Sequence, residues 1–412
     1  MGMRLLVVGG GESALQMAAH VRAGGGQATV LTTTPPDKLA SGPVRSTQVK
    51  VWRTREHERG LGLDLWPEAP QIQGLWFQMV NQGQVVLEFR GQLSNPAVSV
   101  NQPHRFAAWS GLLQDRGAQI HAETGQPITS AYLEHVAQDY DLVVVTTAPS
   151  GSDLANLFPL DPSQPPQAPA RHLAAVYFDG VDPTPTNDAQ FTVLPEGEIL
   201  LIPAYFGDRA TGDGRPCHIV LMEARPGTAL DAFGEVRDPD ARADLMLRLL
   251  RDFAPNVAAR CTRAKLVDQR GTLAGAVRPT VRQPVGYLPQ SGRPVASLGD
   301  LAVSMDPLAA QGANSASDGA AIYARRALAH SGPYDEQFLA ACSAEWRQTR
   351  AYPSRQLTSM LLEPPPMVGQ MLASAAQQPE IANSIAGLFE APWMVEQLAN
   401  QAVAPNAAPA VG

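Results

Sequence analysis

The run Leu298-Gly299-Asp300-Leu301-Ala302-Val303-Ser304-Met305-Asp306-Pro307-Leu308-Ala309-Ala310-Gln311-Gly312-Ala313-Asn314 contains the most informative pattern in this chain. Its apolar start ends at Gly299-Asp300, which predicts a strand followed by a tight turn. Asp306-Pro307 predicts a second turn, because proline fixes one backbone angle and cannot continue a strand. The small residues that follow predict a long helix over 313–330. A carboxylate and a helix N-terminus would therefore follow one strand end.

The N-terminal residues predict a βαβ unit of the nucleotide-binding type. Residues 4–9 are apolar enough for a buried parallel strand, and residues 12–23 have the composition of its crossover helix. Residues 28–32 form the second strand of the unit. Such a unit places a glycine-rich turn between the first strand and the helix, where dinucleotides bind.

That turn is Gly9-Gly10-Gly11-Glu12-Ser13-Ala14. Gly9 permits the tight turn, and Gly11 leaves room for a pyrophosphate that a side chain would strike. The backbone N–H groups at Glu12 and Ser13 would start the helix and attract phosphate oxygens. Ala14 stands where a third glycine often allows close packing. The turn predicts dinucleotide binding, with an ordinary glycine-rich βα turn as the alternative.

Two features of this unit oppose tight binding. The carboxylate of Glu12 is costly beside a pyrophosphate unless the side chain points to solvent. The second strand ends in Thr32-Thr33-Thr34, without the acidic residue that usually holds the adenosine ribose. The sequence therefore predicts a weak grip on the adenosine end of the ligand.

The two motifs, about 290 residues apart, together predict FAD. Asp300 would accept a hydrogen bond from a ribityl hydroxyl. The backbone N–H groups of Gly312, Ala313 and Asn314 would face the flavin N1/C2 edge and stabilise the negative charge of the reduced ring. Taken singly, Asp300 could belong to an Asx turn, and the Gln311–Asn314 segment could be a structural helix cap.

Composition excludes several other classes of function. The net charge is −8 and no dense Lys/Arg cluster occurs, which predicts no nucleic-acid partner. No run approaches the roughly 20 apolar residues of a membrane span. The eight histidines form no HxxxH or HExxH pair and the three cysteines are far apart, which predicts no metal site and reduced thiols in a cytoplasmic protein. Residues 56–59 (Glu-His-Glu-Arg) predict a solvated face.

The remaining pattern predicts an interleaved α/β chain. Residues 1–70, 97–160 and 290–333 would form a discontinuous FAD-binding domain with a Rossmann-like sheet. Residues 71–96, an alternating hairpin, and 161–289, with four strand-like runs, would form an inserted antiparallel β-sheet substrate domain. C-terminal helices would occupy 334–400 and a disordered tail 401–412.

The chain resembles the oxygenase component of two-component styrene and indole monooxygenases. The likeness includes the N-terminal strand–turn–helix, Trp66-Pro67, the run 140–144 (Tyr-Asp-Leu-Val-Val), Gly299-Asp300 and the segment 311–317. The last block is the most specific. The wider flavin hydroxylase group, which includes para-hydroxybenzoate hydroxylase, shares the glycines and the Gly-Asp. The resemblance therefore implies a fold of the para-hydroxybenzoate hydroxylase type.

The resemblance also implies a reaction. Such enzymes receive reduced FAD in trans from a separate NADH-dependent flavin reductase, a transient partner. They react it with O2 to a C4a-(hydro)peroxyflavin and pass one oxygen atom to a small aromatic substrate, by epoxidation or hydroxylation. No second nucleotide-binding turn for NAD(P)H is found, which agrees with this reading. Since the cofactor carries the chemistry, no catalytic side chain is assigned. A homodimer is left open.

Further site residues follow from the resemblance. Arg45 and Thr147 stand where the family contacts FAD, and Pro307 would help shape the wall near the flavin. Thr47 stands in place of the Asn that commonly lines the flavin-side pocket. We expect Thr47, Phe77, Phe206 and Met305 to line the apolar substrate pocket.

Three alternatives remain open. A single-component NAD(P)H-dependent aromatic hydroxylase would share both motifs. A non-catalytic FAD-fold binding protein, of the GDP-dissociation-inhibitor type, would use the fold to present a protein-binding surface. Flavin-dependent halogenases share the fold, but their Trp-x-Trp-x-Ile-Pro signature is absent, since Trp66 and Trp76 are ten residues apart.

Overall fold

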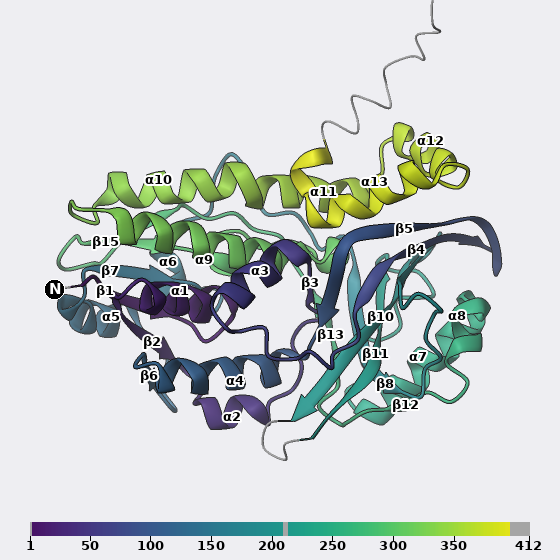
Figure 1. Cartoon of the computed structure of the whole chain (residues 1–412), viewed down its shortest axis with the longest axis horizontal. Helices are drawn as coiled ribbons and strands as arrows, with labels where there is room; N and C mark the ends of the chain where they lie inside the picture. The colour runs from purple at the N-terminus through teal and green to yellow at the C-terminus, as the bar shows by residue number, and fades with distance from the viewer. Residues whose placement is uncertain (1, 209–212, 396–412) are drawn as a thin grey trace, which may run out of the picture.

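The computed structural model describes residues 2–208 and 213–395 of this protein. The predicted tail, 401–412, and the end of the predicted helical segment 334–400 lie outside the described residues. Two sheets stand side by side along the long axis, and helices run along one side of both (Figure 1).

The first sheet has six strands and forms around the N-terminal βαβ unit. All its pairings are parallel except that of its edge pair, β14 and β15. In spatial order the strands are β14 (Val285–Tyr287), β15 (Pro294–Ser297), β7 (Leu142–Val145), β1 (Arg4–Val8), β2 (Gln27–Thr32) and β6 (Gln119–Ala122). The central strand β1 thus lies between the second strand of the unit and a strand about 140 residues away in sequence.

Residues 2–208 and 213–395 contain thirteen α-helices. They are α1 (Glu12–Ala23), α2 (Pro36–Ala40), α3 (Trp52–Gly60), α4 (Gln102–Asp115), α5 (Ser130–Val136), α6 (Asp153–Asn156), α7 (Pro239–Phe253), α8 (Pro255–Arg260), α9 (Gln311–Ala329), α10 (Glu336–Trp346), α11 (Tyr352–Leu362), α12 (Pro366–Ala375) and α13 (Pro379–Glu390). In this part of the chain no helix has the length and hydropathy to cross a membrane.

Strand β1 shows why the first sheet is covered on both faces. Alternate strand residues point to opposite faces, so Leu5 and Val7 enter the core shared with α1, α4, α9 and α10. Leu6 and Val8 enter a second core with α5 and α6. All four side chains are buried, which explains the continuous apolar run of this strand.

The second sheet has nine strands and contains the predicted hairpin and all four predicted strand-like runs. Its pairings are antiparallel except that β4 pairs in parallel with β9. The order is β12 (Lys265–Leu266), β8 (His172–Asp179), β11 (Asp213–Ala224), β10 (Gly197–Asp208), β9 (Ala189–Leu194), β4 (Ile72–Asn81), β5 (Gln84–Ser99) and β3 (Val49–Lys50), with β13 (Thr272–Ala276) on β8.

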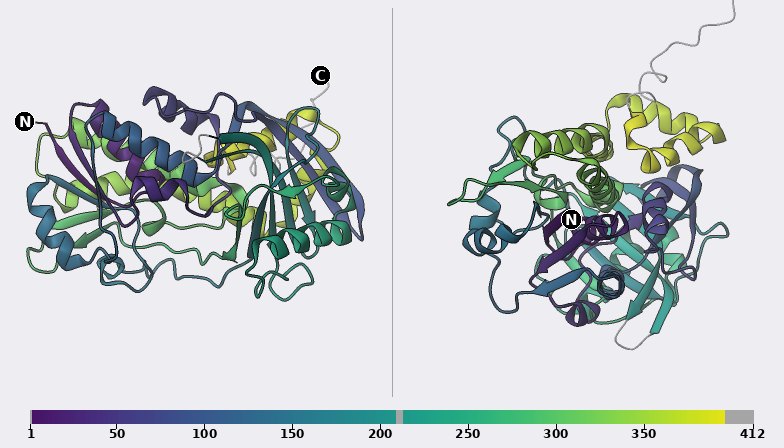
Figure 2. Two further views of the ribbon diagram at one scale, coloured as in Figure 1. Left: turned by 90° about the horizontal axis from the view of Figure 1, so that it is seen from below. Right: turned by 60° about the vertical axis from the view of Figure 1, so that its left-hand side comes forward.

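The two faces of this sheet have different covers. One face packs on α7 and α8 through residues such as Val176 and Met222. The other face, which includes Tyr177 and Leu221, packs against Leu308 and the C-terminal helices α12 and α13. Seen from below, α7 and the C-terminal helices lie on opposite sides of the sheet (Figure 2).

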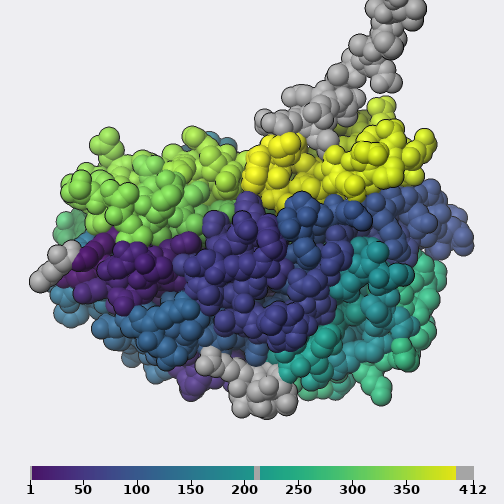
Figure 3. All heavy atoms as spheres, viewed as in Figure 1, coloured from purple at the N-terminus to yellow at the C-terminus, as the bar shows by residue number. Residues whose placement is uncertain are grey.

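Helix α13 covers strand β5 at very short range. A Cβ on Gly91 would collide with the carbonyl of Ala382, so the absence of a side chain at Gly91 permits the contact. Asn383 Oδ1 accepts a 2.8 Å hydrogen bond from the Gln92 N–H next to it. The C-terminal helices cover β5 in the space-filling view (Figure 3).

The predicted fold class is confirmed: a doubly covered Rossmann-like sheet, a largely antiparallel second sheet and C-terminal helices. The sequence missed helices α2, α3, α5, α6 and α8 and the short strands β3, β12, β13 and β14. The prediction of a solvated face at residues 56–59 was wrong for Glu58, which is 2% exposed. The positions of the domain boundaries stay a prediction.

Candidate functional site

The two glycine motifs meet at the carboxyl end of the first sheet. Gly299 has a φ of +62°, and a Cβ there would lie 2.5 Å from the hydroxyl oxygen of Ser13. Leu301 N–H also donates to the carbonyl of Thr146, the residue after β7. A side chain at position 299 is therefore excluded both by conformation and by the first turn of α1.

The N-terminal turn has the shape that a phosphate group requires. Gly9 has a φ of +128°, and its N–H donates a 2.8 Å hydrogen bond to Leu31 O, which closes the turn on β2. A Cβ on Gly11 would meet nothing within 4 Å. Helix α1 begins after Gly11 without a side-chain cap, so its first N–H groups face that open space, and the buried Ala14 allows α1 to pack closely.

The second motif places a carboxylate beside another uncapped helix. The side chain of Asp300 is solvent-accessible, yet enough protein surrounds it for desolvation to raise its pKa. Its Oδ1 lies 4.0 Å from where a Cβ on Gly312 would stand. Helix α9 begins there without a side-chain cap, after Ala310 in the left-handed conformation. Asp300 and the start of α9 thus form one polar surface.

The remaining predicted cofactor residues differ in their exposure and in their contacts with this surface. Thr147 is exposed, and its methyl group lies 3.1 Å from a Cβ position on Gly9. Pro307 is half-buried and starts a 3₁₀ turn, Pro307–Ala309. Ala313 is half-buried in the first turn of α9. Arg45 is exposed, and no described contact joins it to the two motifs.

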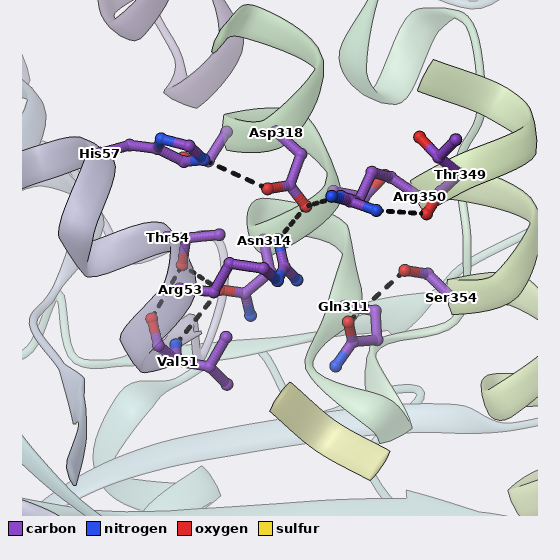
Figure 4. A network of polar contacts seen from close by, with 12 residues as sticks. Val51, Arg53, Thr54, His57, Gln311, Asn314, Asp318, Thr349, Arg350 and Ser354 are labelled. Atoms are coloured by element: carbon purple, nitrogen blue, oxygen red, sulfur yellow. Dashed lines mark hydrogen bonds and ion pairs between the residues drawn. The ribbon is translucent and has the colours of Figure 1, made fainter. Parts of the chain in front are cut away.

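The side chain of Asn314 connects the start of α9 to β3 and to the start of α3. Its amide nitrogen donates to Val49 O and Ala310 O, at 2.9 and 2.7 Å. Its amide oxygen accepts from Val51 N–H and from the hydroxyl of Thr54, at 3.2 and 2.6 Å (Figure 4). Both N–H donors and both acceptor positions of this amide are occupied, so only the backbone of Asn314 is available to a ligand.

One helical turn further, Asp318 joins α9 to two other segments. Its carboxylate pairs with Arg53 and lies 3.4 Å from His57 Nε2, both on α3, and 3.7 Å from Arg350 of the π-helical turn Arg347–Ala351 (Figure 4). Burial opposes ionisation of Asp318, but the hydrogen bonds from His57 and Arg53 lower its pKa below the ordinary value. A buried carboxylate of this kind stays charged because Arg53 and Arg350 beside it are cations.

Glu12 does not point to solvent. Its Oε1 accepts 2.9 Å and 2.5 Å hydrogen bonds from Lys50 Nζ and Gln16 Nε2, and its Oε2 accepts from Gln48. At 7% exposure it belongs to a buried cluster of two acids and two bases. We call Glu12, Lys50, Glu58 and Arg105 the four-charge cluster. The carboxylate is therefore compensated inside the protein, and only the backbone of Glu12 can face a phosphate.

The other members of the four-charge cluster complete a compensated set. Arg105 donates a 2.7 Å hydrogen bond to Glu58 Oε1, and Lys50 Nζ lies 3.5 Å from the same oxygen. Burial raises the pKa of Glu58, while Arg105 and Lys50 oppose that shift. Lys50 also donates to the carbonyl of Ala313 at 3.2 Å. The cluster thus connects the first turns of α1 and α9, a role that sequence reasoning missed.

The predicted substrate-pocket residues divide between two places. Phe77 stacks on Phe89 and Phe191, with ring centroids 5.0 and 5.8 Å apart, under α13. Phe206 packs edge-on against Tyr177 at 5.6 Å. The Tyr177 hydroxyl donates a hydrogen bond to Ser46 O, next to Thr47, so Thr47 and Phe206 both lie close to Tyr177.

Met305 and Thr47 are both buried, at 8% and 7% exposure. Met305 packs in the core of the first sheet, whereas Phe206 and Phe77 belong to the core of the second.

No group of three His, Cys, Asp or Glu side chains in the described ranges could hold a metal ion.

Comparison with known proteins agrees with the geometry. A family model described as "Styrene monooxygenase A putative substrate binding domain" matches residues 151–260. Styrene monooxygenase StyA of Pseudomonas fluorescens is 28% identical over 406 residues, which cover 95% of this chain and 94% of that protein. The resemblance predicted from the motifs is confirmed.

Solved structures support the same fold. The flavin-dependent brominase Bmp2 superposes with a TM-score of 0.68 at 12% identity, over 97% of this chain and 99% of that one. The p-nitrophenol 4-monooxygenase PnpA of Pseudomonas putida DLL-E4 gives a TM-score of 0.61 at 15% identity, over 94% and 97% of the two chains. At these identities the likeness establishes the fold alone.

Proposed function

We propose that this protein binds FAD and transfers one oxygen atom from O2 to a small aromatic compound. The proposal follows from its likeness to styrene monooxygenase along nearly the whole chain. The observation that carries the proposal is the apposition of Gly299 with Ser13. This contact brings two uncapped helix N-termini and one accessible carboxylate to the same sheet edge.

The residues at this edge fit FAD. In the proposal, the first turn of α1, from Gly11 to Ala14, holds the pyrophosphate, because its N–H groups are uncapped and a Cβ on Gly11 would meet open space. Asp300 accepts a hydrogen bond from the ribityl chain. Gly9, Thr147 and Arg45 complete the phosphate side, and Pro307 stands at the flavin side.

Bound in its reduced form, FAD supplies the electrons that activate O2. The start of α9 offers the N–H groups of Gly312, Ala313 and Asn314 together with the positive end of a helix dipole. These groups stabilise negative charge on the ring. Lys50 holds this turn in place through Ala313 O, and the buried aromatic residues of the second sheet keep water away.

We further propose that a separate NADH-dependent flavin reductase supplies the reduced FAD. The alignment with a styrene monooxygenase, which covers 95% of this chain at 28% identity, supports this proposal. The substrate would be styrene- or indole-like. Thr47 and Phe206, which lie together beside Tyr177, would line its pocket, whereas Phe77 packs under α13 and Met305 in the core of the first sheet. The cytoplasmic location and the homodimer considered from the sequence stay predictions.

The two-component reading is tested with purified protein, FAD, NADH and styrene or indole under 18O2. We expect labelled product only when a flavin reductase is added, or when photoreduced FAD replaces it. Rapid oxygen consumption without a reductase would favour the single-component alternative. Absence of product with photoreduced FAD and both substrates would contradict an oxygenase of this specificity.

The cofactor site is tested separately from turnover. Asp300→Ala should weaken FAD binding about tenfold or more, since a lost hydrogen bond to a charged group costs about 1.5–3 kcal/mol. Asp115→Asn, at the exposed end of α4, is the matched control and should leave the affinity unchanged. Equal FAD affinities of the two variants would remove Asp300 from the site.

A further inference from the structure

A cavity of about 530 Å³ lies at the edge of the second sheet. It is formed by β8, β11, β13 and the loop before α7, and its lining includes Leu173, Met222, Leu230, Phe233, Arg237 and Arg242. We propose that this cavity binds a small organic carboxylate with an apolar body. The site is additional to the proposed oxygenase site.

The cavity lies on the opposite face of the sheet from the FAD motif. Met222 and Ala224, on β11, belong to the core under α7. Their neighbour Leu221 points to the other face, where the core includes Leu308 of the Pro307–Ala309 turn. A ligand in this cavity and a ligand at the FAD motif would therefore be separated by the thickness of the sheet.

Two guanidinium groups against the one carboxylate of Asp231 give the cavity an excess of positive charge. Arg242 donates to Val236 O and to the hydroxyl of Thr272, and Arg237 donates to Gly234 O, all of them neutral acceptors. No ion pair within the described ranges joins either arginine to a carboxylate. Burial and the nearby Arg237 lower the pKa of Arg242. An anion placed between the two groups would relieve this repulsion.

The acidic residue of the cavity does not provide that anion. Asp231 accepts hydrogen bonds of 2.9 Å from the N–H of Gly227 and from His172 Nδ1. These contacts, against the opposing effect of burial, hold the pKa of Asp231 below its ordinary value. The Asp231 carboxylate is thus ionised and already partnered, and the charges of the two arginines stay available.

The rest of the lining fits an apolar body. Met222, Leu230 and Phe233 are each at most 6% exposed and belong to one apolar core beside the cavity. A volume of about 530 Å³ lies within the range of roughly 300–1,000 Å³ typical of small-molecule sites. Arginine matches a carboxylate through paired N–H donors, which makes a carboxylate the preferred anion.

Isothermal titration calorimetry with benzoate tests the charge requirement, with benzyl alcohol as a neutral probe of similar size. We expect benzoate to bind and benzyl alcohol to bind at least tenfold more weakly. Arg237→Gln should weaken benzoate at least tenfold, because Arg237 is exposed and its loss leaves the fold intact. Arg248→Gln, exposed on α7 outside the cavity, should bind benzoate as the unchanged protein does.

A steric variant tests the location. Ala276, which is exposed and lines the cavity at the end of β13, lies on the same face of the strand as Ala274, which packs against the core under α7, so Ala276→Leu should reduce the cavity. Benzoate affinity should fall at least tenfold in this variant. In the unchanged protein, saturating FAD and styrene should leave the benzoate affinity as it is without them. Displacement of benzoate by styrene, indifference of benzoate affinity to Arg237→Gln and Ala276→Leu, or no benzoate binding at millimolar concentration would each overturn the proposal. None of these outcomes depends on the oxygenase reaction.

Discussion

The hydroxyl of Ser317 donates a 2.6 Å hydrogen bond to Oε1 of Gln16, so that residues 301 positions apart in sequence connect α9 directly to α1. Gln16 in turn donates to Glu12 Oε1 at 2.5 Å. The four-charge cluster continues from Glu12 through Lys50 to the carbonyl of Ala313. Both helix N-termini of the proposed FAD site are therefore fixed by one buried polar network.

Lys50→Met should disturb both ends of this network. The variant leaves Glu12 and Glu58 with one cation between them, and breaking a buried ion pair costs about 3–5 kcal/mol. We expect the free energy of unfolding to fall by about that amount, and FAD binding to weaken in the protein that remains folded. Urea denaturation and equilibrium FAD titration measure the two effects.

The control for this variant is Lys38→Met, because Lys38 is exposed on α2. The double variant Glu12→Gln, Lys50→Met should recover part of the lost stability, because it again balances one acid with one base. If Lys50→Met and Lys38→Met unfolded at the same urea concentration, the cluster would have no stabilising role.

Gly299→Ala should impair FAD binding as well as stability. Its φ of +62° strains any side chain, and the added Cβ would lie 2.5 Å from Ser13 Oγ. Gly292→Ala is a matched control, since Gly292 has a φ of +65° and a Cβ there meets nothing within 4 Å. We expect a loss of about 1 kcal/mol at Gly292, from conformation alone, and a larger loss at Gly299. Only Gly299→Ala should weaken FAD binding, as measured by fluorescence titration.

Glu223→Gln should change how stability depends on pH. Glu223 is fully buried; burial, then Asp306 and Glu198, raise its pKa well above the ordinary 4.5. Its protonated form is thus favoured in the folded protein. Its contribution to stability is full below pH 4.5 and falls as the pH rises toward the folded pKa, by about 1.4 kcal/mol per pH unit.

The glutamine cannot ionise, so the stability of Glu223→Gln relative to the unchanged protein should increase from pH 5 to pH 8. Glu235→Gln, at an exposed loop position, provides the control and should show a constant difference. Urea denaturation at each pH measures the trend. A parallel pH dependence for Glu223→Gln and the unchanged protein would contradict the assigned direction.

Trp393→Leu should loosen the C-terminal segment. The Trp393 ring lies 5.2 Å from the guanidinium carbon of Arg53 and 4.5 Å from that of Arg350, the two arginines that surround Asp318. Each cation–π contact contributes about 0.5–1 kcal/mol, so we expect a loss of about 1–2 kcal/mol. Met394→Ala, at an exposed neighbour, should have little effect. Faster proteolysis of Trp393→Leu than of Met394→Ala would agree with the prediction, and equal rates would contradict it.

The local sequence pattern predicted well those elements of the fold that depend on residues adjacent in sequence. The apolar run of β1, the glycine turn and α1 were placed within one residue of their observed bounds, because each depends on neighbouring residues. Helix α3 was missed because its sequence, Trp52–Gly60, is strongly polar. Its polar residues are stabilised by partners on other elements, such as Arg105 for Glu58 and Asp318 for Arg53.

The sequence by itself therefore determined the two glycine motifs, the alternation of buried residues in the sheets and the expectation of one ligand between the chain ends. Only the tertiary structure decided where the charges go. It placed the Glu12 carboxylate against Lys50 and the side chain of Asn314 against Val49 and Thr54. The physical reason is that a buried charge or amide is stable only with partners, and partners far apart in sequence become neighbours only when the chain folds.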